Sequence, residues 1–472
     1  MDNKFISIVK SFSYAISSNL ISMLISALVT LIVPKVIGVE DYGYWQIYLF
    51  YASYVGFLHF GWNDGVYLKY GGMKYKELNK KPLFSQFWTL SVFQLFIAIL
   101  AIIGISSAFS SENEIFVFSM IALNVLFVNT RIFLIYILQA TGRIKDYSKT
   151  TIVDRIIYFI LISGLILLGV KSFYLLVFAD LVGKCISLIY TMVMCKDIVF
   201  RRISEFYIDI KEIVANISSG SKLMFANIAS SLILGTVKFG IERSWSVATF
   251  GKVSLTLSVS NLLMKFIIAI SLVIYPILRN ARKEQLSSIY MGIRNILMLV
   301  LLGSLTFYYP INFLLSIWLP EYAESLEYMA LVFPIIIFEG KVGLLTNTYL
   351  KTLREEKLLL KINVITVILS VISTIVTTVL LENLVLAMIS IVILLALKSI
   401  IAEKYLSGIL SIDVWYDIVL ELIMTFIFIF VAWNINAWFG MLIYLTVYIL
   451  YIGIKFNDFR DTFRFMKALI VK

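Results

Sequence analysis

The residues of this sequence that could do chemistry are ionisable side chains inside long apolar segments. A charge at the middle of a bilayer costs roughly 3 kcal/mol or more unless it is paired or faces water. Grouped around a water-filled cavity, a majority of cations would create a positive potential that favours an anionic ligand. The candidate cavity cations are Arg131, Lys184, Lys238, Lys265 and Lys341, and the candidate acids are Asp64, Asp180 and Glu339.

Arg131 is the strongest single candidate for binding an anion. A guanidinium can bind a phosphate or a carboxylate through two parallel hydrogen bonds. Lys184, Lys265 and Lys341 would act as point charges. Arg131 and Lys265 have no acid within one helical turn, so their local sequence offers no ion pair.

Local pairing is the alternative for two of these cations. Asp180 and Lys184 are four residues apart, which places them on one helix face where they can neutralise each other. Lys238 and Glu242 have the same spacing. Lys238 can also extend its ammonium to the membrane interface. These pairs therefore have a structural explanation that competes with a role in substrate binding.

The acids are candidates for ion coupling. Glu339 and Lys341 are two residues apart and point in different directions, so they pair poorly with each other. Asp64 follows a Gly-Trp-Asn sequence, where it could cap a helix or pair with Lys69. Asp64, Asp180 and Glu339 are the candidate proton carriers, and coupling to an ion gradient is the energy source that we expect.

Enzymatic and metal chemistry is not indicated. The only histidine is His59, and the two cysteines, Cys185 and Cys195, are ten residues apart on one expected helix, where they face different ways. The sequence has no nucleotide-binding loop and no catalytic motif that uses two histidines. We expect a transporter rather than an enzyme, with no metal site and no cofactor.

The elements that must position these residues are membrane-spanning helices. Hydrophobic residues make up 61% of the 472 positions, and an apolar run of about 20 residues crosses a hydrocarbon core about 30 Å thick. We expect an all-α polytopic protein with about 14 such runs: 12–33, 44–68, 84–107, 115–139, 151–170, 173–195, 215–240, 253–278, 291–314, 326–350, 358–380, 384–406, 416–433 and 437–455.

The charges between the runs alternate along the chain and predict the orientation. One set of alternate loops, which includes both termini, contains most of the 40 Lys and Arg residues; the other set contains only Lys35, Lys171, Arg243 and Lys252. By the positive-inside rule the basic side is cytoplasmic. The net charge of +11 is therefore explained by topology and by anionic lipid headgroups, and not by nucleic acid.

The order of the runs suggests four regions. Residues 1–196 form an N-lobe of six spans, and 215–407 form a C-lobe of six spans. The linker 197–214 has apolar residues at helical spacing and predicts an amphipathic helix on the cytoplasmic surface. Residues 408–472 contain two further spans and a basic tail whose apolar stripe predicts a second surface helix.

Eight short fragments are spread along the chain. They are PKVIG at 34–38, EDYGYW at 40–45, FGWNDG at 60–65, KYGG at 69–72, LQATGR at 138–143, ER at 242–243, FG at 250–251 and WLPEY at 318–322. In their order and spacing over the whole length, these fragments resemble the polysaccharide-exporter flippases of bacteria (Wzx-type), in the MATE-like MOP superfamily.

The resemblance implies a fold and a function. The fold would be two six-helix lobes around a central cavity. The function would be movement of an undecaprenyl-diphosphate-linked oligosaccharide, an O-antigen or capsule repeat unit in lipopolysaccharide or capsule biosynthesis, across the bacterial inner membrane by alternating access. Membrane lipids and polysaccharide assembly proteins would be its partners. The resemblance transfers no site residues, so the candidate site rests on the placement of charge.

Two other functions stay open on the sequence. A drug or cation antiporter of the same superfamily would need acids in its cavity, whereas cations dominate among the candidates here. A membrane polysaccharide polymerase or ligase would need a long outer loop, whereas outer segments such as 107–114 are short.

Overall fold

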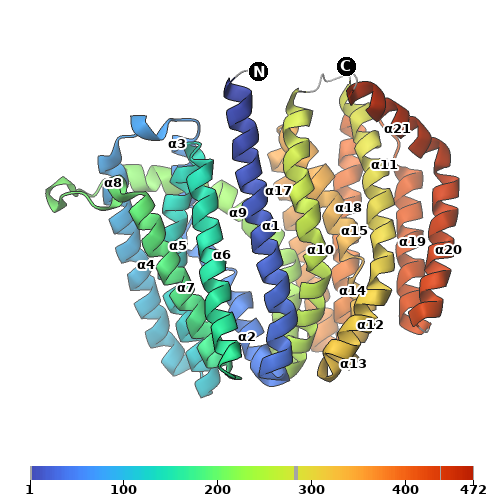
Figure 1. Cartoon of the computed structure of the whole chain (residues 1–472), viewed down its shortest axis with the longest axis horizontal. Helices are drawn as coiled ribbons and strands as arrows, with labels where there is room; N and C mark the ends of the chain where they lie inside the picture. Colours follow the sequence, from blue (N-terminus) through green and yellow to red (C-terminus); the bar gives the residue numbers. More distant parts are fainter. Residues whose placement is uncertain (1–2, 281–284, 436, 471–472) are drawn as a thin grey trace. The chain divides into compact units, whose positions relative to one another are not determined.

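The computed structural model of the chain describes residues 3–280, 285–435 and 437–470. The described residues form helices and connecting loops (Figure 1), which confirms the all-α class. Contacts divide the chain into two compact units. Unit 1 contains residues 1–228 and 247–251, and unit 2 contains residues 229–246 and 252–472. The division therefore falls later in the chain than the expected linker at 197–214.

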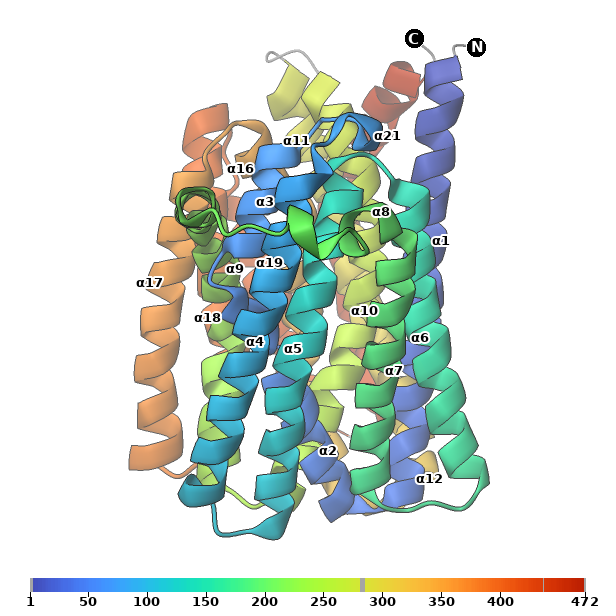
Figure 2. The same ribbon diagram turned by 90° about the vertical axis from the view of Figure 1, so that its left-hand side faces the viewer.

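Unit 1 is an antiparallel helical bundle, in which α5 packs against α4 and α7, and α1 packs against α6. Figure 2 shows α4, α5, α7 and α6 running side by side. Their connections are short, so successive helices end at opposite ends of the bundle. The long helices of unit 1 are α1 (Asn3–Ile37), α2 (Val39–Ala52), α4 (Lys80–Ala108), α5 (Glu112–Ala140), α6 (Ile144–Leu167) and α7 (Phe173–Met194).

The second expected span is broken, so the prediction of one continuous helix over 44–68 was wrong. After α2 the chain forms a 3₁₀ turn (Val55–His59) and then the short helix α3 (Trp62–Tyr70). Phe60 and Gly61 between them have φ of 55° and 87°, in the left-handed region that ends a helix and that glycine adopts without strain. Hydropathy alone does not reveal such a break.

Glycines bring α3 into backbone contact with the first part of α9 (Ile210–Ser244). A Cβ atom on Gly220 would lie 2.0 Å from the carbonyl oxygen of Gly61, and one on Gly65 would lie 2.0 Å from that of Asn216. No side chain fits between the two backbones. This crossing therefore requires glycine on both helices.

The prediction of one amphipathic helix over 197–214 was wrong. The segment instead forms α8 (Lys196–Val199), a 3₁₀ turn (Ile203–Glu205) and an extended stretch before α9. Two side chains of α4 form hydrogen bonds with the backbone of this segment. Trp88 Nε1 donates to the carbonyl of Val199 at 3.1 Å, and Ser85 Oγ accepts from the Tyr207 amide at 3.2 Å. Its apolar side chains remain exposed, with Ile203 at 88%, as expected for a segment at a membrane surface.

Unit 2 contains the remaining helices, including the second part of α9 and most of α10. Two of its spans include π-helical turns, at Val342–Thr346 and Ile375–Leu380, and α21 leaves α20 at a bend of 63° (Figure 1). The principal helices are α10 (Val247–Asn280), α11 (Leu286–Ser304), α12 (Tyr308–Trp318), α13 (Ala323–Glu327), α14 (Met329–Val332), α15 (Ile335–Lys341), α16 (Asn347–Thr352), α17 (Glu356–Thr374), α18 (Leu384–Leu410), α19 (Trp415–Asn434), α20 (Ala437–Ile454) and α21 (Phe456–Ile470). The helix expected in the C-terminal tail is thus present.

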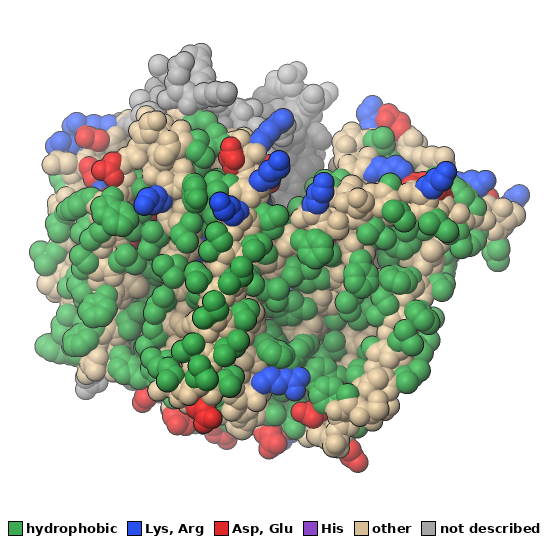
Figure 3. All heavy atoms as spheres, turned by 180° about the vertical axis from the view of Figure 1, so that it is seen from behind, with side chains coloured by type: hydrophobic (Ala, Val, Ile, Leu, Met, Phe, Trp, Pro, Cys, Tyr) green, Lys and Arg blue, Asp and Glu red, His purple; other side chains and the backbone are tan. Residues whose placement is uncertain are grey.

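The chain is a multi-pass membrane protein. Among the described residues, 11 helices are long and apolar enough to cross a membrane, or up to 12 if a bent pair is one span. The expected number of about 14 is therefore approximate. On the face shown in Figure 3, hydrophobic side chains cover the middle of each unit, and most charged side chains lie at its ends. This distribution matches a hydrocarbon layer between two polar surfaces.

Candidate functional site

The candidate site in unit 1 begins at Arg131 on α5. Its Nη1 atom lies 3.3 Å from Oδ1 of Asp154 on α6, and its Nη2 atom donates to the carbonyl of Thr150 at 3.2 Å. The side chain is only 15% exposed. Arg131 therefore has an acidic partner on the neighbouring helix, which differs from the unpaired cation that the local sequence suggests.

Arg155, which we did not single out in the sequence, is the more accessible cation. Its side chain is 42% exposed, and its ion pair is a long one, 3.8 Å from Nε to Oδ2 of Asp154. It lies about 16 Å along α6 from Ile144, at 1.5 Å per residue. It was missed because the apolar run starts near residue 151, whereas α6 starts at Ile144, so Arg155 lies inside the helix and not near its end.

Arg155 lines a cavity of about 150 Å³ within unit 1. The lining combines this guanidinium with aromatic rings and with groups that can form hydrogen bonds, and the cavity is smaller than most small-molecule sites. The complete lining is Ser26, Val29, Thr30, Tyr42, Trp45, Gln46, Leu49, Arg155 and Tyr158, from α1, α2 and α6.

Asp180 and Lys184 pair with each other on α7, as their spacing predicts. Lys184 Nζ lies 2.7 Å from Asp180 Oδ2, and the same oxygen accepts a hydrogen bond from the Tyr48 hydroxyl at 2.6 Å. Lys184 also lies over the Tyr48 ring, 5.6 Å from its centroid. The local-pairing alternative is thus realised, and Tyr48 links the pair to α2.

The five ionisable groups around Asp154 and Asp180 have a positive net formal charge. The cations are Arg131, Arg155 and Lys184, and the acids are Asp154 and Asp180; three cations minus two acids leave +1. Asp180 and Lys184 neutralise each other. The excess positive charge therefore belongs to Arg131 and Arg155, which share the carboxylate of Asp154. An anion near Arg155 would complete the pairing.

Asp64 lies beside the histidine of the preceding turn. The His59 Nε2 atom is 3.6 Å from Asp64 Oδ2, both side chains are buried, and the backbone N–H of Gly61 donates to His59 Nδ1 at 3.0 Å. Because Nδ1 accepts this bond, a neutral imidazole carries its proton on Nε2, facing Asp64. Lys69, which Asp64 could have paired with, instead binds Glu212 at 2.5 Å.

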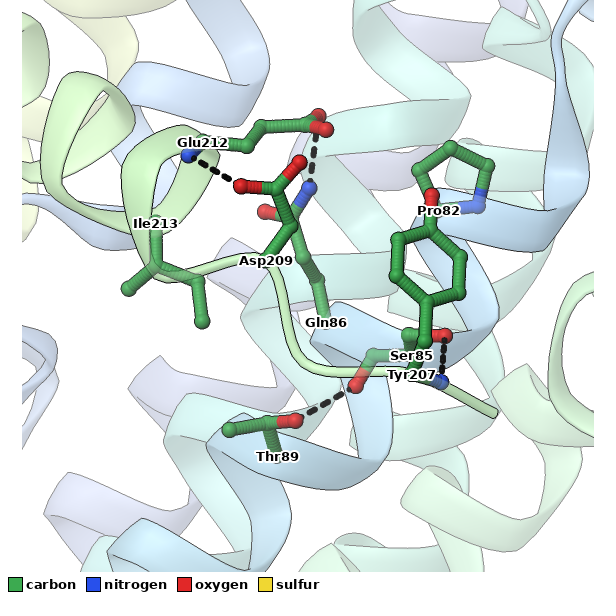
Figure 4. Close-up of a pocket in the computed structure, with 8 residues that line it drawn as sticks. All are labelled: Pro82, Ser85, Gln86, Thr89, Tyr207, Asp209, Glu212 and Ile213. Carbon is green, nitrogen blue, oxygen red and sulfur yellow. Dashed lines mark hydrogen bonds between the residues drawn. The ribbon is translucent and has the colours of Figure 1, made fainter.

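Glu212, at the start of α9, connects this helix to α3 and α4 through hydrogen bonds of its carboxylate. Its carboxylate accepts hydrogen bonds from Lys69 on α3 and from Gln86 on α4, at 2.5 and 2.8 Å, and its own backbone N–H donates to Asp209. The pocket that Gln86, Asp209 and Glu212 line (Figure 4) has a volume of only about 10 Å³. It holds no more than about one water molecule, so we assign it a structural role.

Lys341 lies in a buried ion network of unit 2 and not beside a water-filled space. Its Nζ atom is 2.6 Å from both Glu403 Oε2 and Glu421 Oε2, and its side chain is 1% exposed. Arg294 binds the other oxygens of these two acids, at 2.6 and 2.5 Å. It also reaches Asp417 at 3.3 Å. The placement expected for Lys341 was therefore wrong, because carboxylates from α18 and α19 neutralise it.

The remaining candidates also belong to unit 2. Glu339 lies 3.5 Å from Lys398 on α18, so it too has a partner on another helix. Lys238 is half-buried on α9. Lys265 lies on α10, but its side chain is outside the described residues. Arg131, Asp180 and Lys184 belong to unit 1.

The described part of the chain contains no group of side chains placed to bind a metal ion. No group of three His, Cys, Asp or Glu side chains there is placed to hold a metal ion. The described interior offers ion pairs and one accessible guanidinium.

Sequence comparison finds no match: no family model matches the chain, and no curated protein matches it. Solved structures, by contrast, match over nearly their whole length. An inward-facing MATE-family multidrug resistance transporter of the MOP superfamily is 12% identical and has a TM-score of 0.64, with 82% of this chain and 94% of that chain covered. The lipid II flippase MurJ, in an inward closed conformation, is 14% identical and has a TM-score of 0.59, with 98% and 99% covered.

A third similar structure is again that of a transporter. It is a MOP-superfamily transporter from Pyrococcus furiosus, for which a binding pocket of reverse polarity suggests a different function. It is 13% identical, covers 85% of this chain and 96% of its own, and has a TM-score of 0.51. At identities this low the comparisons establish the fold alone. The chain therefore has the fold shared by the MATE-family transporters of the MOP superfamily and the lipid II flippase MurJ.

Proposed function

We propose that this protein is a flippase that carries an undecaprenyl-diphosphate-linked oligosaccharide across the bacterial inner membrane by alternating access. The substrate would be an O-antigen or capsule repeat unit. The protein would be a transporter and not an enzyme, with both termini in the cytoplasm. Membrane lipids and polysaccharide assembly proteins would be its partners.

The observation that carries this proposal is the incompletely paired guanidinium of Arg155. It lies inside a membrane-spanning helix, lines a cavity, and shares a single carboxylate with Arg131. A phosphate oxygen can replace the missing acceptor through a charge-assisted hydrogen bond. A diphosphate lipid head carries that negative charge.

The fold supports a lipid-linked substrate but does not decide between substrates. It is found both in a lipid II flippase and in multidrug transporters. Charge is therefore the more informative property. A carrier of organic cations would need a net negative interior, whereas the group around Asp154 and Asp180 in unit 1 has a formal charge of +1.

The charges at the two ends of unit 1 support the proposed orientation. Loops 71–79, 141–143 and 195–209 lie at one end and contain several Lys and Arg residues, whereas loops 109–111 and 168–172 lie at the other and contain only Lys171. The positive-inside rule then places the first end in the cytoplasm.

The decisive experiment is a flipping assay with purified protein in liposomes. A fluorescent undecaprenyl-diphosphate oligosaccharide is added, and its accessibility to an impermeant quencher is followed over time. Wild-type protein should accelerate flipping, and Arg155→Ala should slow it at least about tenfold. The matched control is Arg202→Ala, in an exposed loop of the same unit, which should flip at the wild-type rate.

The same liposomes test the alternative of a MATE-like drug or cation antiporter. Efflux of a cationic dye against an imposed proton or sodium gradient, without any flipping of the lipid, would replace our proposal with that function. Imposing the gradients during lipid flipping also tests ion coupling. Asp64 and Asp180 are the buried acids of unit 1 that we propose for it.

A further inference from the structure

The cavity that Arg155 lines in unit 1 also contains three neutral polar side chains whose hydrogen-bonding groups are unused. They are Thr30 on α1, Gln46 on α2 and Tyr158 on α6. Within the part of the chain that the structure describes, none of these three side chains forms a hydrogen bond. The Arg155 guanidinium has only its long contact with Asp154, 3.8 Å from Nε. The cavity therefore presents several polar groups that the protein itself does not pair.

Gln46 and Tyr158 are the most deeply buried of these groups, at 7% and 9% exposure. Polar groups buried to this extent are hydrogen-bonded as a rule, because an unpaired one keeps the cost of leaving water. Neither the Gln46 amide nor the Tyr158 hydroxyl is among the unpartnered atoms of the described chain that are fully closed off from solvent. Water or a ligand in the cavity can therefore supply their missing partners.

The chemistry of the lining calls for both a negative charge and hydroxyl groups in a ligand. Arg155 only donates and binds an anionic oxygen most strongly. The Gln46 amide, by contrast, both donates and accepts, and so do the hydroxyls of Thr30 and Tyr158. An ionised phosphate alone would leave their accepting atoms unused. A hydroxyl group both donates and accepts, so it complements these side chains fully.

The size of the cavity limits which part of a substrate can enter it. At about 30 Å³ for each water molecule, its volume of about 150 Å³ equals the space of about five waters. One phosphate group and a few hydroxyl-bearing carbons occupy such a space, whereas an oligosaccharide exceeds it. The cavity thus matches the place where a phosphate joins a sugar, and not a whole repeat unit.

We propose that this cavity binds the phosphate–sugar junction of the transported lipid, and that Gln46 recognises the sugar. Arg155 binds a phosphate oxygen, and the Gln46 amide exchanges hydrogen bonds with a hydroxyl group of the adjoining sugar. This inference rests on the proposed function and adds that the sugar-free prenyl diphosphate is a poor substrate. A site built for a hydroxyl rejects an analogue that lacks it, because its buried polar groups then stay unpaired.

The first test measures binding by calorimetry, with full-length protein in nanodiscs. The probes are glycerol 1-phosphate and propyl phosphate, which have the same charge and carbon chain and differ in their hydroxyl groups. Wild-type protein should bind glycerol 1-phosphate at least about tenfold more tightly than propyl phosphate. Gln46→Leu should reduce this preference to less than about twofold, and Arg155→Ala should weaken the binding of both probes. Equal binding of the two probes by wild type, or an undiminished preference in Gln46→Leu, would overturn the proposal.

The matched control is Gln139→Leu, at a partly buried glutamine of α5 outside this cavity. It should retain the wild-type preference for glycerol 1-phosphate. Gln46→Leu should fold, because the Gln46 side chain has no hydrogen bond to lose within the described chain. Equal loss of the preference in both leucine variants would mean a general disturbance and would overturn the role of Gln46. Absence of binding of either probe to wild type would overturn the site itself.

The second test uses the liposome flipping assay with unlabelled lipids as competitors of the fluorescent substrate. Glycosylated undecaprenyl diphosphate should compete with wild type at least about tenfold more strongly than the sugar-free lipid, and this difference should disappear in Gln46→Leu. Equal competition by the two lipids in wild type would overturn recognition of the sugar. Protein that prefers glycerol 1-phosphate as expected but flips no lipid would overturn the proposed function and leave the site in place.

Discussion

Arg131 and Asp154 form an ion pair between α5 and α6, with Nη1 and Oδ1 3.3 Å apart. The two residues lie on successive helices and are far apart in the sequence. The pair joins two neighbouring spans of unit 1 and leaves only one further oxygen of Asp154, at 3.8 Å, for Arg155. Arg131 is thus positioned as the structural member of the two arginines, and Arg155 as the one available to a ligand.

The first prediction concerns this pair. Arg131→Ala and Asp154→Ala should each destabilise the protein, and the double variant should lose less stability than the sum of the two. We expect a coupling free energy of about 1–3 kcal/mol, because contacting residues in a partly buried pair are not additive. Thermal unfolding in detergent measures it. Strict additivity would show that the pair contributes nothing.

Arg155 should behave differently. Arg155→Ala should leave the melting temperature nearly unchanged, because the side chain is partly exposed and its ion pair is long. Arg155→Lys should retain part of the flipping rate, since an ammonium keeps the charge but not the two parallel hydrogen bonds. If the alanine and lysine variants flip equally well, charge at this position is not used.

Lys341 should affect stability and not substrate affinity directly. Lys341→Met removes one of the two cations that bind the buried carboxylates of Glu403 and Glu421. Arg294 is then the cation that the two acids share. Loss of one partner from a buried ion network costs about 3–5 kcal/mol. We expect a lower melting temperature and less protein in the membrane. A stable variant with a selective loss of flipping would return Lys341 to the substrate site.

The glycine crossing offers a steric test. In Gly220→Ala the new methyl group would lie 2.0 Å from the Gly61 carbonyl oxygen and 2.3 Å from the Gly65 nitrogen. We expect destabilisation of about 1–3 kcal/mol or more from overpacking. Gly104→Ala on α4 is the matched control, since its methyl group meets nothing within 4 Å. The control should unfold at or above the wild-type temperature.

Asp197, between α7 and α9, gives a pH dependence. Burial alone would raise the pKa of Asp197, but hydrogen bonds from Lys80 and Tyr75 outweigh it and hold the pKa below its usual value. Because its pKa is lower in the folded state, ionised Asp197 stabilises the folded protein at pH values above its unfolded-state pKa of about 4. This stabilisation is lost as the pH falls toward the folded-state pKa. The melting temperature of Asp197→Asn should therefore fall less between about pH 5 and pH 3 than that of wild type. Glu77→Gln, at an exposed acid, should retain the wild-type slope.

The sequence predicted the helices well because each must cover a hydrocarbon layer, and hydropathy measures that requirement directly. It did not predict the break at Phe60 and Gly61, since left-handed backbone leaves no trace in hydropathy. It also placed the start of α6 too late, because polar residues such as Lys145 and Lys149 lengthen the helix beyond its apolar part. Arg155 was overlooked for that reason alone.

The ion network of unit 2 was beyond sequence reasoning for a different reason. Spacing rules detect partners within one helix, whereas Arg294 finds its carboxylates 109 and 127 residues away. One signal was available. Glu403 and Glu421 lie inside apolar runs of their own, and two unexplained acids should have prompted a search for two buried bases.

The contact between Gly61 and Gly220 limits how unit 1 can rearrange. The backbone of α3 lies directly against the backbone at the start of α9, with no side chain between them. The two segments therefore cannot slide or rotate past each other without losing this contact. During any transport cycle these two segments must travel together as one rigid piece. Any bending of unit 1 would then have to occur elsewhere, for example at the left-handed corner at Phe60, directly before this piece.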